Sequence, residues 1–167
     1  MKNDNSNIFI NEFIKKSRNL PHIQNPGSYY FITYNSYNHF VFTETHKEII
    51  SENLKYFDSK YYNLYSFVIM PDHIHLIIQP LENTENEFYS ISKIMHSLKS
   101  YTSKKIINSL DDKHKSTKIY QSEYYDRIIR NENDLFEKLN YIVNNPVKAG
   151  LSDNGINYKW FYLKEFV

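Results

Sequence analysis

The stretch Val68-Ile69-Met70-Pro71-Asp72-His73-Ile74-His75-Leu76-Ile77-Ile78-Gln79 decides the fold of this chain. Its two apolar runs flank a Pro-Asp pair, a pattern typical of two strands joined by a tight turn. Because side chains alternate between the two faces of a strand, His73 and His75 point the same way, opposite to Ile74 and Leu76. Two imidazoles side by side on a rigid strand favour half of a metal site. Ordinary half-buried strand histidines are the alternative.

Length and composition bound the class of protein. The chain has 167 residues, of which 41% are hydrophobic and 23% charged, as expected of one globular domain. It has no cysteine, which excludes disulfides, thiolate zinc sites and cysteine nucleophiles. No apolar run is long enough to span a membrane, and the polar N-terminus lacks the apolar core of a signal peptide. We therefore expect a cytoplasmic protein with no membrane partner, a flexible segment over residues 1–20 and one domain over residues 21–167.

Charge and aromatic content do not choose a function. The formal net charge is only +1, so no global field indicates a nucleic-acid partner. Aromatic residues make up 17% of the chain, including 16 tyrosines. Such a surface suits base stacking, but a codon bias toward Lys, Asn, Ile and Tyr would produce the same excess.

Hydrophobic periodicity predicts the other elements around the central hairpin. We expect strands over residues 29–35, 62–70, 73–79 and 119–130, and helices over residues 45–58, 90–110 and 132–144. This order predicts an α+β fold, a ferredoxin-like or RRM-like β-α-β-β-α-β antiparallel sheet with helices on one face and an added C-terminal helix. The other face is then free to hold a site, and the two histidines lie on a central strand.

The last predicted helix brings a further pair of side chains. Tyr141 and Asn145 are four residues apart and therefore share a helix face, which points away from the apolar stripe. Pro146 disfavours helix at Asn145, which places both residues in the final turn. The alternative is a surface tyrosine and a helix-ending asparagine. The apolar stripe itself consists of Leu135, Phe136, Leu139, Ile142 and Val143.

Five blocks of sequence carry a resemblance to a known family. They are Leu20-Pro21-His22 with Pro26-Gly27 and residues 30–33, then residues 68–75, 97–102, 124–130 and 141–151. In this order and at these separations they resemble the REP-associated tyrosine transposases. That family is related to the insertion-sequence single-tyrosine transposases of the HUH endonuclease superfamily. The resemblance covers about residues 20–151.

The resemblance implies a site and a reaction. It implies that His73 and His75 are metal ligands, that Tyr141 is the nucleophile and that Asn145 is the third ligand. The implied activity is metal-dependent cleavage and strand transfer of hairpin-flanked single-stranded DNA through a 5′-phosphotyrosine. Two neutral imidazoles and an amide leave a divalent cation electron-poor, so Mg²⁺ or Mn²⁺ is expected. The rival nucleophiles are Tyr124 and Tyr125.

Six basic residues are candidate DNA contacts, through the phosphate backbone. They are Lys93, Lys99, Lys104, Arg127, Arg130 and Lys148. Solvated surface or salt bridging is the alternative for each. The expected partner is single-stranded DNA with a hairpin. A homodimer in which Tyr141 acts on the metal site of a second subunit is also open, because the wider superfamily includes dimers that exchange this helix.

The chain departs from the family pattern in three places. It has Asp72 where the family commonly has Asn, Tyr120 where it has Trp, and Phe161-Tyr162 where Ser-Ser often follows Trp160. The third change bears on the family's C-terminal DNA contacts. Two other functions remain open from the residues themselves. One is a non-catalytic RRM-like module that binds single-stranded nucleic acid, and the other is a metal-dependent phosphodiesterase that uses water.

Overall fold

The central hairpin forms as predicted in a computed structural model that describes residues 27–84 and 87–164. Strand β2 covers Tyr62–Ile69 and β3 covers His73–Pro80, and the two strands pair antiparallel. The turn is closed by the Met70 amide, which donates to the His73 carbonyl at 2.8 Å. Most side chains on both strands are buried, which explains why they read as almost continuous apolar runs.

Three further strands complete a sheet with the order β4-β1-β3-β2-β5, antiparallel throughout. Strand β1 spans Tyr30–Asn35, β4 spans Tyr125–Ile128 and β5 spans Phe161–Leu163. The first four strands have the ferredoxin-like order, so the predicted fold class is confirmed. Strand β5 is an addition that the sequence analysis does not anticipate.

The strand predicted over residues 119–130 is wrong in length, because only Tyr125–Ile128 forms a ladder with β1. Tyr120 makes a single bridge to Ser36. Between them the chain leaves the sheet, and the Ser122 carbonyl accepts a hydrogen bond from the Lys99 ammonium at 2.8 Å instead of from a neighbouring strand.

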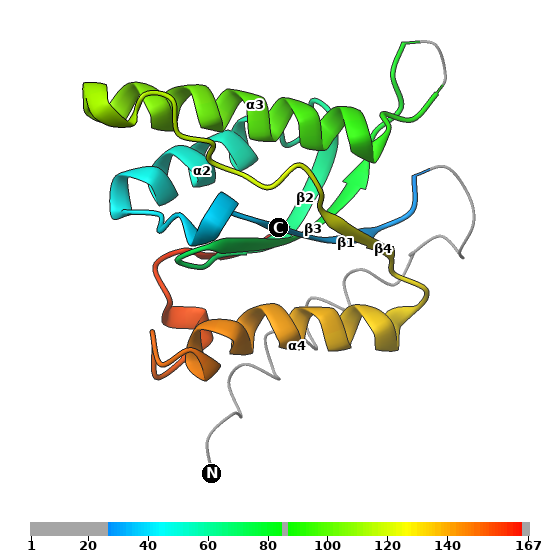
Figure 1. Ribbon diagram of the computed structural model, residues 1–167. Coiled ribbons are helices and arrows are strands. Elements are labelled where there is room, and N and C mark those ends of the chain that lie inside the picture. Colours follow the sequence, from blue (N-terminus) through cyan, green and yellow to red (C-terminus); the bar gives the residue numbers. More distant parts are fainter. Residues whose placement is uncertain (1–26, 85–86, 165–167) are drawn as a thin grey trace.

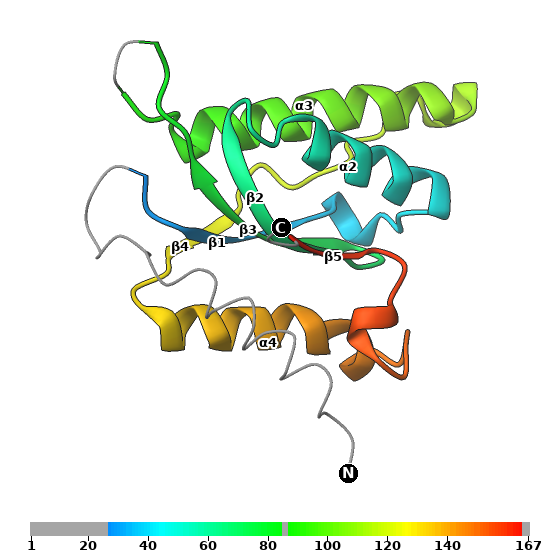
Figure 2. The same ribbon diagram turned by 180° about the vertical axis from the view of Figure 1, so that it is seen from behind.

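Helices cover both faces of the sheet (Figure 1). Helices α2 (Glu44–Tyr56) and α3 (Ile91–Ser109) lie on one face, and α4 (Glu132–Lys148) lies on the other. The view from behind gives the same three layers and shows β5 at the far edge (Figure 2). The expectation that the second face stays free is therefore wrong. The apolar stripe of α4 needs a partner, and the sheet face that carries the histidines supplies it.

The sheet separates two hydrophobic cores. The larger core lies beneath α2 and α3 and contains Ile74, Leu76 and Ile78 of β3. The second core lies beneath α4, where the buried stripe of the helix meets the sheet. It contains Phe31, Val68, Ile77, Leu135, Leu139, Ile142 and Val143. The residue between two histidines thus belongs to one core, and the histidines face the other.

Helix α4 runs past the expected end at residue 144. It includes Pro146 and ends at Lys148. Two backbone bonds close it: Gly150 N–H donates to Val147 O at 3.0 Å and Leu151 N–H to Pro146 O at 2.8 Å. This is a Schellman motif, and Gly150 takes the required left-handed conformation with φ of 70°. The C-terminal closure and the burial of Pro146 hold the last turn helical despite the proline.

The remaining elements are short 3₁₀ helices at Tyr37–His39, Asp112–His114 and Gly155–Asn157. None of the helices in the described part of the chain has the length and apolarity to cross a membrane. The segment 1–20 that was expected to be flexible, and the sequence block from Leu20 to Pro26, lie outside the described residues.

Candidate active site

The two histidines of β3 lie on the α4 face of the sheet, as the alternation predicts. Their rings are 4.9 Å apart between centroids. They differ in burial, because His75 is 3% exposed whereas the side chain of His73 is 27% exposed. The shared face is thus confirmed, but it is not open: α4 covers His75 and leaves His73 at the rim.

His75 is fixed on every side. Its Nδ1 lies 2.7 Å from Thr33 Oγ1, its Nε2 lies 3.2 Å from Asn145 Nδ2, and its ring stacks on Phe31 at 5.6 Å. An amide nitrogen can only donate, so Nε2 accepts from Asn145 and the ring proton sits on Nδ1. Burial, and then the neighbouring His73, lower the pKa of His75 to about 3. The ring is therefore neutral at physiological pH, the form that binds a metal.

His73 is oriented by the residue before it. Its Nδ1 lies 2.7 Å from Asp72 Oδ1, and the same carboxylate reaches His39 Nδ1 through Oδ2 at 3.5 Å. The hydrogen bond from His73 holds the pKa of Asp72 below its usual value. An ionised carboxylate only accepts hydrogen bonds, so Nδ1 of His73 carries a proton, and in the neutral ring Nε2 is the nitrogen with the lone pair. Such a carboxylate partner is the usual support of a metal-binding histidine.

Helix α4 places Tyr141 and Asn145 over this pair. The Tyr141 ring lies edge-on to His75 at 4.9 Å and to Phe31 at 5.9 Å. Tyr141 is nevertheless 44% exposed, and no hydrogen bond engages its hydroxyl within residues 27–84 and 87–164. The helix has the predicted geometry: Tyr141 and Asn145 share one face, which lies outside the apolar stripe. Asn145 lies in the last turn of the helix, as predicted, whereas Tyr141 lies one turn earlier because the helix continues to Lys148.

The donor atoms fit a divalent metal. Both imidazoles are held through Nδ1, which leaves their Nε2 atoms as donors. Asn145 already touches Nε2 of His75, and a half-turn of its amide would present the oxygen in place of the nitrogen. Because this set contains only two histidines and an amide, it is not a cluster of three His, Cys, Asp or Glu, and the described residues hold no such cluster.

The six basic residues predicted to contact DNA do not gather in one place. Lys148 lies beside the site, with its Nζ 6.0 Å from the centroid of the Tyr141 ring. Arg127 forms an ion pair with buried Asp134 at 3.4 Å, and the Arg130 amide donates to the same carboxylate at 3.0 Å. This ion pair ties β4 to the start of α4. The other three residues, Lys93, Lys99 and Lys104, are on α3 across the sheet.

The two rival tyrosines point to opposite faces of the sheet. Tyr125 pairs with Thr33 on the α4 face and is 57% exposed, so it lies next to the residue that holds His75. Tyr124 packs against the core beneath α3. Neither has a ring contact with His73 or His75 in the described residues, whereas Tyr141 does.

Sequence reasoning missed the roles of three neighbours. Thr33 and Phe31 contact His75 only because β1 pairs with β3 in a register that sets Thr33 opposite His75. No local pattern encodes that register. In the sequence analysis Asp72 is only a departure from the family pattern, although its position next to His73 in a tight turn is a usable signal for a supporting carboxylate.

Comparisons with known proteins show which sequences and folds this chain is similar to. The family model described as "Transposase IS200 like" matches residues 25–145, which include His73, His75, Tyr141 and Asn145. A protein of Haemophilus influenzae that carries the name of a REP-associated tyrosine transposase is 28% identical over 134 residues, 74% of this chain and 73% of the relative.

Two solved structures share the fold. A REP-associated tyrosine transposase bound to a REP hairpin has a TM-score of 0.66 at 19% identity, over 84% of this chain and 79% of that one. A Deinococcus radiodurans R1 protein assigned as a transposase has a TM-score of 0.51 at 14% identity, over 68% of this chain and 87% of that one. Since the family model spans most of the chain and all four site residues, the chain belongs to the IS200-like transposase family.

Proposed function

We propose that this transposase cleaves and rejoins single-stranded DNA beside a hairpin, through a 5′-phosphotyrosine on Tyr141. A divalent cation, Mg²⁺ or Mn²⁺, would be held by His73, His75 and Asn145. One observation carries the proposal: α4 sets the phenol ring of Tyr141 4.9 Å from His75 and the Asn145 amide on Nε2 of the same imidazole, within one chain. The hairpin in the solved structure of similar fold supports a hairpin partner here.

The residues around the site support metal binding before any ligand arrives. Thr33 and Asp72 fix the two imidazoles through Nδ1, so a metal can bind both Nε2 atoms without rotation of either ring, once the Asn145 amide nitrogen turns away from Nε2 of His75. Bound there, the metal would supply Lewis-acid polarisation of the scissile phosphate. The neutral donor set leaves room for phosphate oxygens to complete the coordination.

Tyr141 would carry the covalent step. Its phenolic oxygen attacks phosphorus, the bond from phosphorus to the 3′ oxygen breaks, the phenol proton passes to solvent and the 3′ oxygen takes up a proton. The products are a 5′-phosphotyrosine and a free 3′-OH. The Lys148 ammonium, 6.0 Å from the ring, would stabilise the negative charge on the phenol oxygen as its proton leaves. The covalent link keeps the phosphodiester energy, so a new 3′-OH can reverse the step and join strands without ATP.

The position of the phenol favours an unpaired strand. Tyr141 reaches the site from between α4 and the sheet, with Phe31 and His75 against its ring. A phosphate must therefore approach the phenol close beside the helix, which a strand splayed away from its complement can do. Tyr125, 57% exposed and beside Thr33, is placed to stack an unpaired base next to the site.

The experiment is incubation with a hairpin that carries a single-stranded flank, in Mn²⁺ or Mg²⁺, followed by a denaturing gel. We expect a covalent protein–DNA adduct that excess EDTA prevents and that intact duplex DNA does not form. Cleavage without an adduct would indicate a phosphodiesterase that uses water. Binding without cleavage would indicate the non-catalytic RRM-like module. Undiminished cleavage in EDTA would contradict the metal site.

A further inference from the structure

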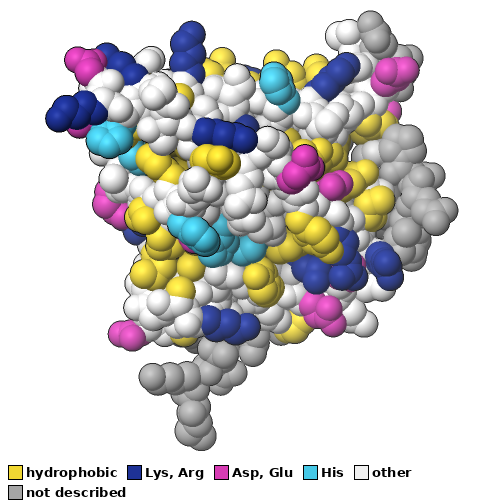
Figure 3. Space-filling view, in the orientation of Figure 1, with side chains coloured by type: hydrophobic (Ala, Val, Ile, Leu, Met, Phe, Trp, Pro, Cys, Tyr) yellow, Lys and Arg dark blue, Asp and Glu magenta, His cyan; other side chains and the backbone are white. Residues whose placement is uncertain are grey.

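Helix α3 concentrates positive charge in a chain that is nearly neutral overall. Its 19 residues, Ile91–Ser109, contain no aspartate or glutamate. They do contain Lys93, Lys99, Lys104 and Lys105, while the whole chain carries a net charge of only +1. Figure 3 shows separate Lys or Arg side chains spread along the side of the molecule formed by α3. This surface lies across the sheet from α4 and takes no part in the site described above.

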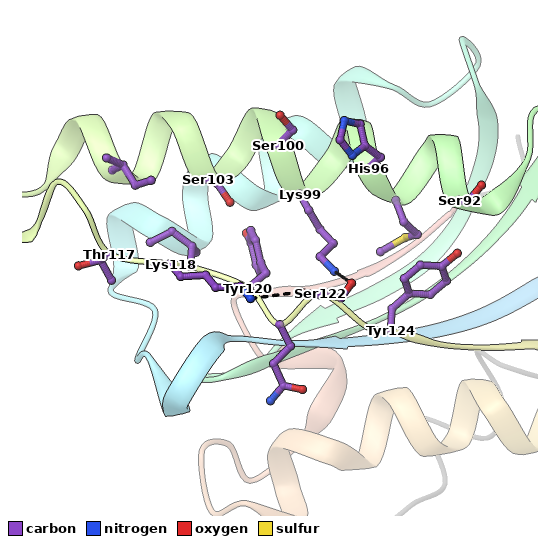
Figure 4. Close-up of a pocket in the computed structure, with 14 residues that line it drawn as sticks. Ser92, His96, Lys99, Ser100, Ser103, Thr117, Lys118, Tyr120, Ser122 and Tyr124 are labelled. Carbon is purple, nitrogen blue, oxygen red and sulfur yellow. Dashed lines mark hydrogen bonds between the residues drawn. The ribbon is translucent and has the colours of Figure 1, made fainter.

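A groove opens beside this helix. It has a volume of about 570 Å³ and lies between α3 and the segment 117–124 that leads into β4 (Figure 4). Its lining mixes cations, hydroxyls and aromatic rings. The lining residues that matter here are Lys99, Ser103, Lys118, Ser122 and Tyr124.

Two ammonium groups converge in this groove on a single residue, Ser122. Lys99 Nζ donates to the Ser122 carbonyl at 2.8 Å, and Lys118 Nζ donates to the hydroxyl of the same residue at 3.2 Å. In the described part of the chain neither lysine forms an ion pair with a carboxylate. Burial lowers the pKa of Lys99, Glu123 opposes that shift, and Lys118 adds to it. Two like charges held together in this way favour an anion between them.

The groove also has a stacking surface next to its charge. The Lys99 ammonium lies 5.7 Å from the centroid of the Tyr124 ring. Figure 4 shows Lys99 reaching down from α3 to Ser122, with Lys118 on one side and Tyr124 on the other. Cations that follow a backbone, with an aromatic ring for a base, are the pattern that binds single-stranded nucleic acid.

The groove and the active site lie on opposite faces of the sheet, both near its edge strand β4. Strand β4 is the edge strand, and it begins at Tyr125, directly after Tyr124. Tyr124 packs on the α3 side, whereas Tyr125 lies beside Thr33 on the α4 side. The same face of the molecule presents the α3 lysines above and histidine side chains below them (Figure 3). A single strand can therefore cross β4 from one tyrosine to the next.

We propose that the groove between α3 and residues 117–124 binds the phosphodiester backbone of the single strand that leaves the cleavage site over β4. Lys99 and Lys118 clamp a phosphate, and Tyr124 stacks on a neighbouring base. This inference rests on the proposed function, because it names where the flank of that DNA substrate goes. Lys93 and Lys104, which lie outside the groove lining, are not needed for this contact.

The test is DNA binding by fluorescence anisotropy in EDTA, with a hairpin carrying a long single-stranded flank and with the hairpin alone. The double variant Lys99→Gln/Lys118→Gln should bind the flanked DNA about tenfold more weakly. A plot of the logarithm of its binding constant against the logarithm of salt concentration should be less steep by about 1.4, which is about 0.7 for each lost phosphate contact. Binding of the bare hairpin should stay unchanged. The matched control is Lys55→Gln/Lys60→Gln, which removes the same charge away from the groove.

Tyr124→Leu is a second, charge-neutral variant, with exposed Tyr56→Leu as its control. It should lower the affinity for the flanked DNA by about tenfold and leave the salt dependence of binding unchanged. Inorganic phosphate at matched ionic strength should not displace the flank; displacement would show that the groove takes a free anion and not a DNA backbone.

The adduct assay keeps this inference separate from the proposed function. If the wild-type chain forms the adduct but both groove variants bind flanked DNA like their controls, the groove inference is overturned and the proposed function stands. If the wild-type chain forms no adduct but the lysine variant still binds flanked DNA more weakly than its control, the proposed reaction fails and the groove remains a DNA site.

Discussion

The α4 side and the α3 side of this sheet use polar side chains in opposite ways. On the α4 side, His75 is buried, and hydrogen bonds with Thr33 and Asn145 fix the orientation of its ring. On the α3 side, Lys99 and Lys118 are long side chains that meet at one residue and keep their charge near solvent. The difference separates chemistry from binding: the first side is built for fixed geometry, and the second for attraction to a flexible polyanion.

The largest expected effect is the loss of the covalent step in Tyr141→Phe. The substitution removes one oxygen, leaves the ring contacts with His75 and Phe31, and should eliminate the adduct while DNA binding and the fold stay intact. Tyr125→Phe is the matched control and should keep forming the adduct. A denaturing gel and anisotropy measure the two properties. An adduct that survives in Tyr141→Phe would place the nucleophile elsewhere.

Alanine substitutions of the two histidines should have the same effect on cleavage but different effects on stability. His73→Ala and His75→Ala should both abolish cleavage and reduce Mn²⁺ binding measured by calorimetry. Only His75→Ala should also lower the free energy of unfolding, by about 2 kcal/mol, because it removes a buried ring and leaves Thr33 and Asn145 without a partner. Urea unfolding in EDTA measures this term. Equal destabilisation by the two variants would contradict the difference in burial.

Supporting groups should have intermediate effects. Asn145→Ala and Asp72→Asn should each weaken metal binding by about tenfold to a hundredfold, and high Mn²⁺ should partly restore cleavage. Glu44→Gln is the control for loss of one carboxylate, because Glu44 bonds Trp160 and Lys159 and has no hydrogen bond to His73 or His75 in the described residues. Full activity of Asp72→Asn at low Mn²⁺ would show that the carboxylate does not orient His73.

The smallest expected effect is a pH dependence of stability. The pKa of His75 is about 3 in the folded chain, below its ordinary value of 6.5, so the unfolded chain binds the extra proton between these values. Stability from this group is complete above pH 6.5 and is lost as the pH falls toward 3. Between pH 7 and 5.5 we expect a loss of about 1 kcal/mol. His75→Gln should flatten this slope, whereas exposed His39→Gln should not; identical slopes in all three proteins would refute it.

Local patterns explain what the sequence could predict. Period-two alternation places His73 and His75 on one face, and the spacing of Tyr141 and Asn145 places both on one side of a helix. These relations hold within a single element, so they survive folding unchanged. The order of strands and helices then leads to the antiparallel sheet that the structure has.

Tertiary pairing explains what the sequence could not predict. The bond from Thr33 to His75 depends on the register of β1 against β3, and the burial of His75 depends on α4 covering that face. Helix α4 extends past Pro146 because the Schellman motif at Gly150 closes its C-terminus. This motif depends on several residues together, so the helix propensity of any one residue does not predict it. The groove at Lys99 needs residues 117–124 to leave the sheet, which their strand-like composition does not reveal.

The central claim is that α4 brings Tyr141 onto the histidine pair of its own chain. The most direct measurement mixes unlabelled wild-type protein with ¹⁵N-labelled His75→Ala protein, traps the DNA adduct in Mn²⁺ and identifies the DNA-linked peptide by mass spectrometry. The account predicts DNA on Tyr141 of unlabelled chains alone. A labelled Tyr141 peptide would show action on a second subunit in a homodimer, and DNA on Tyr124 or Tyr125 would show a different nucleophile; either result would contradict the account.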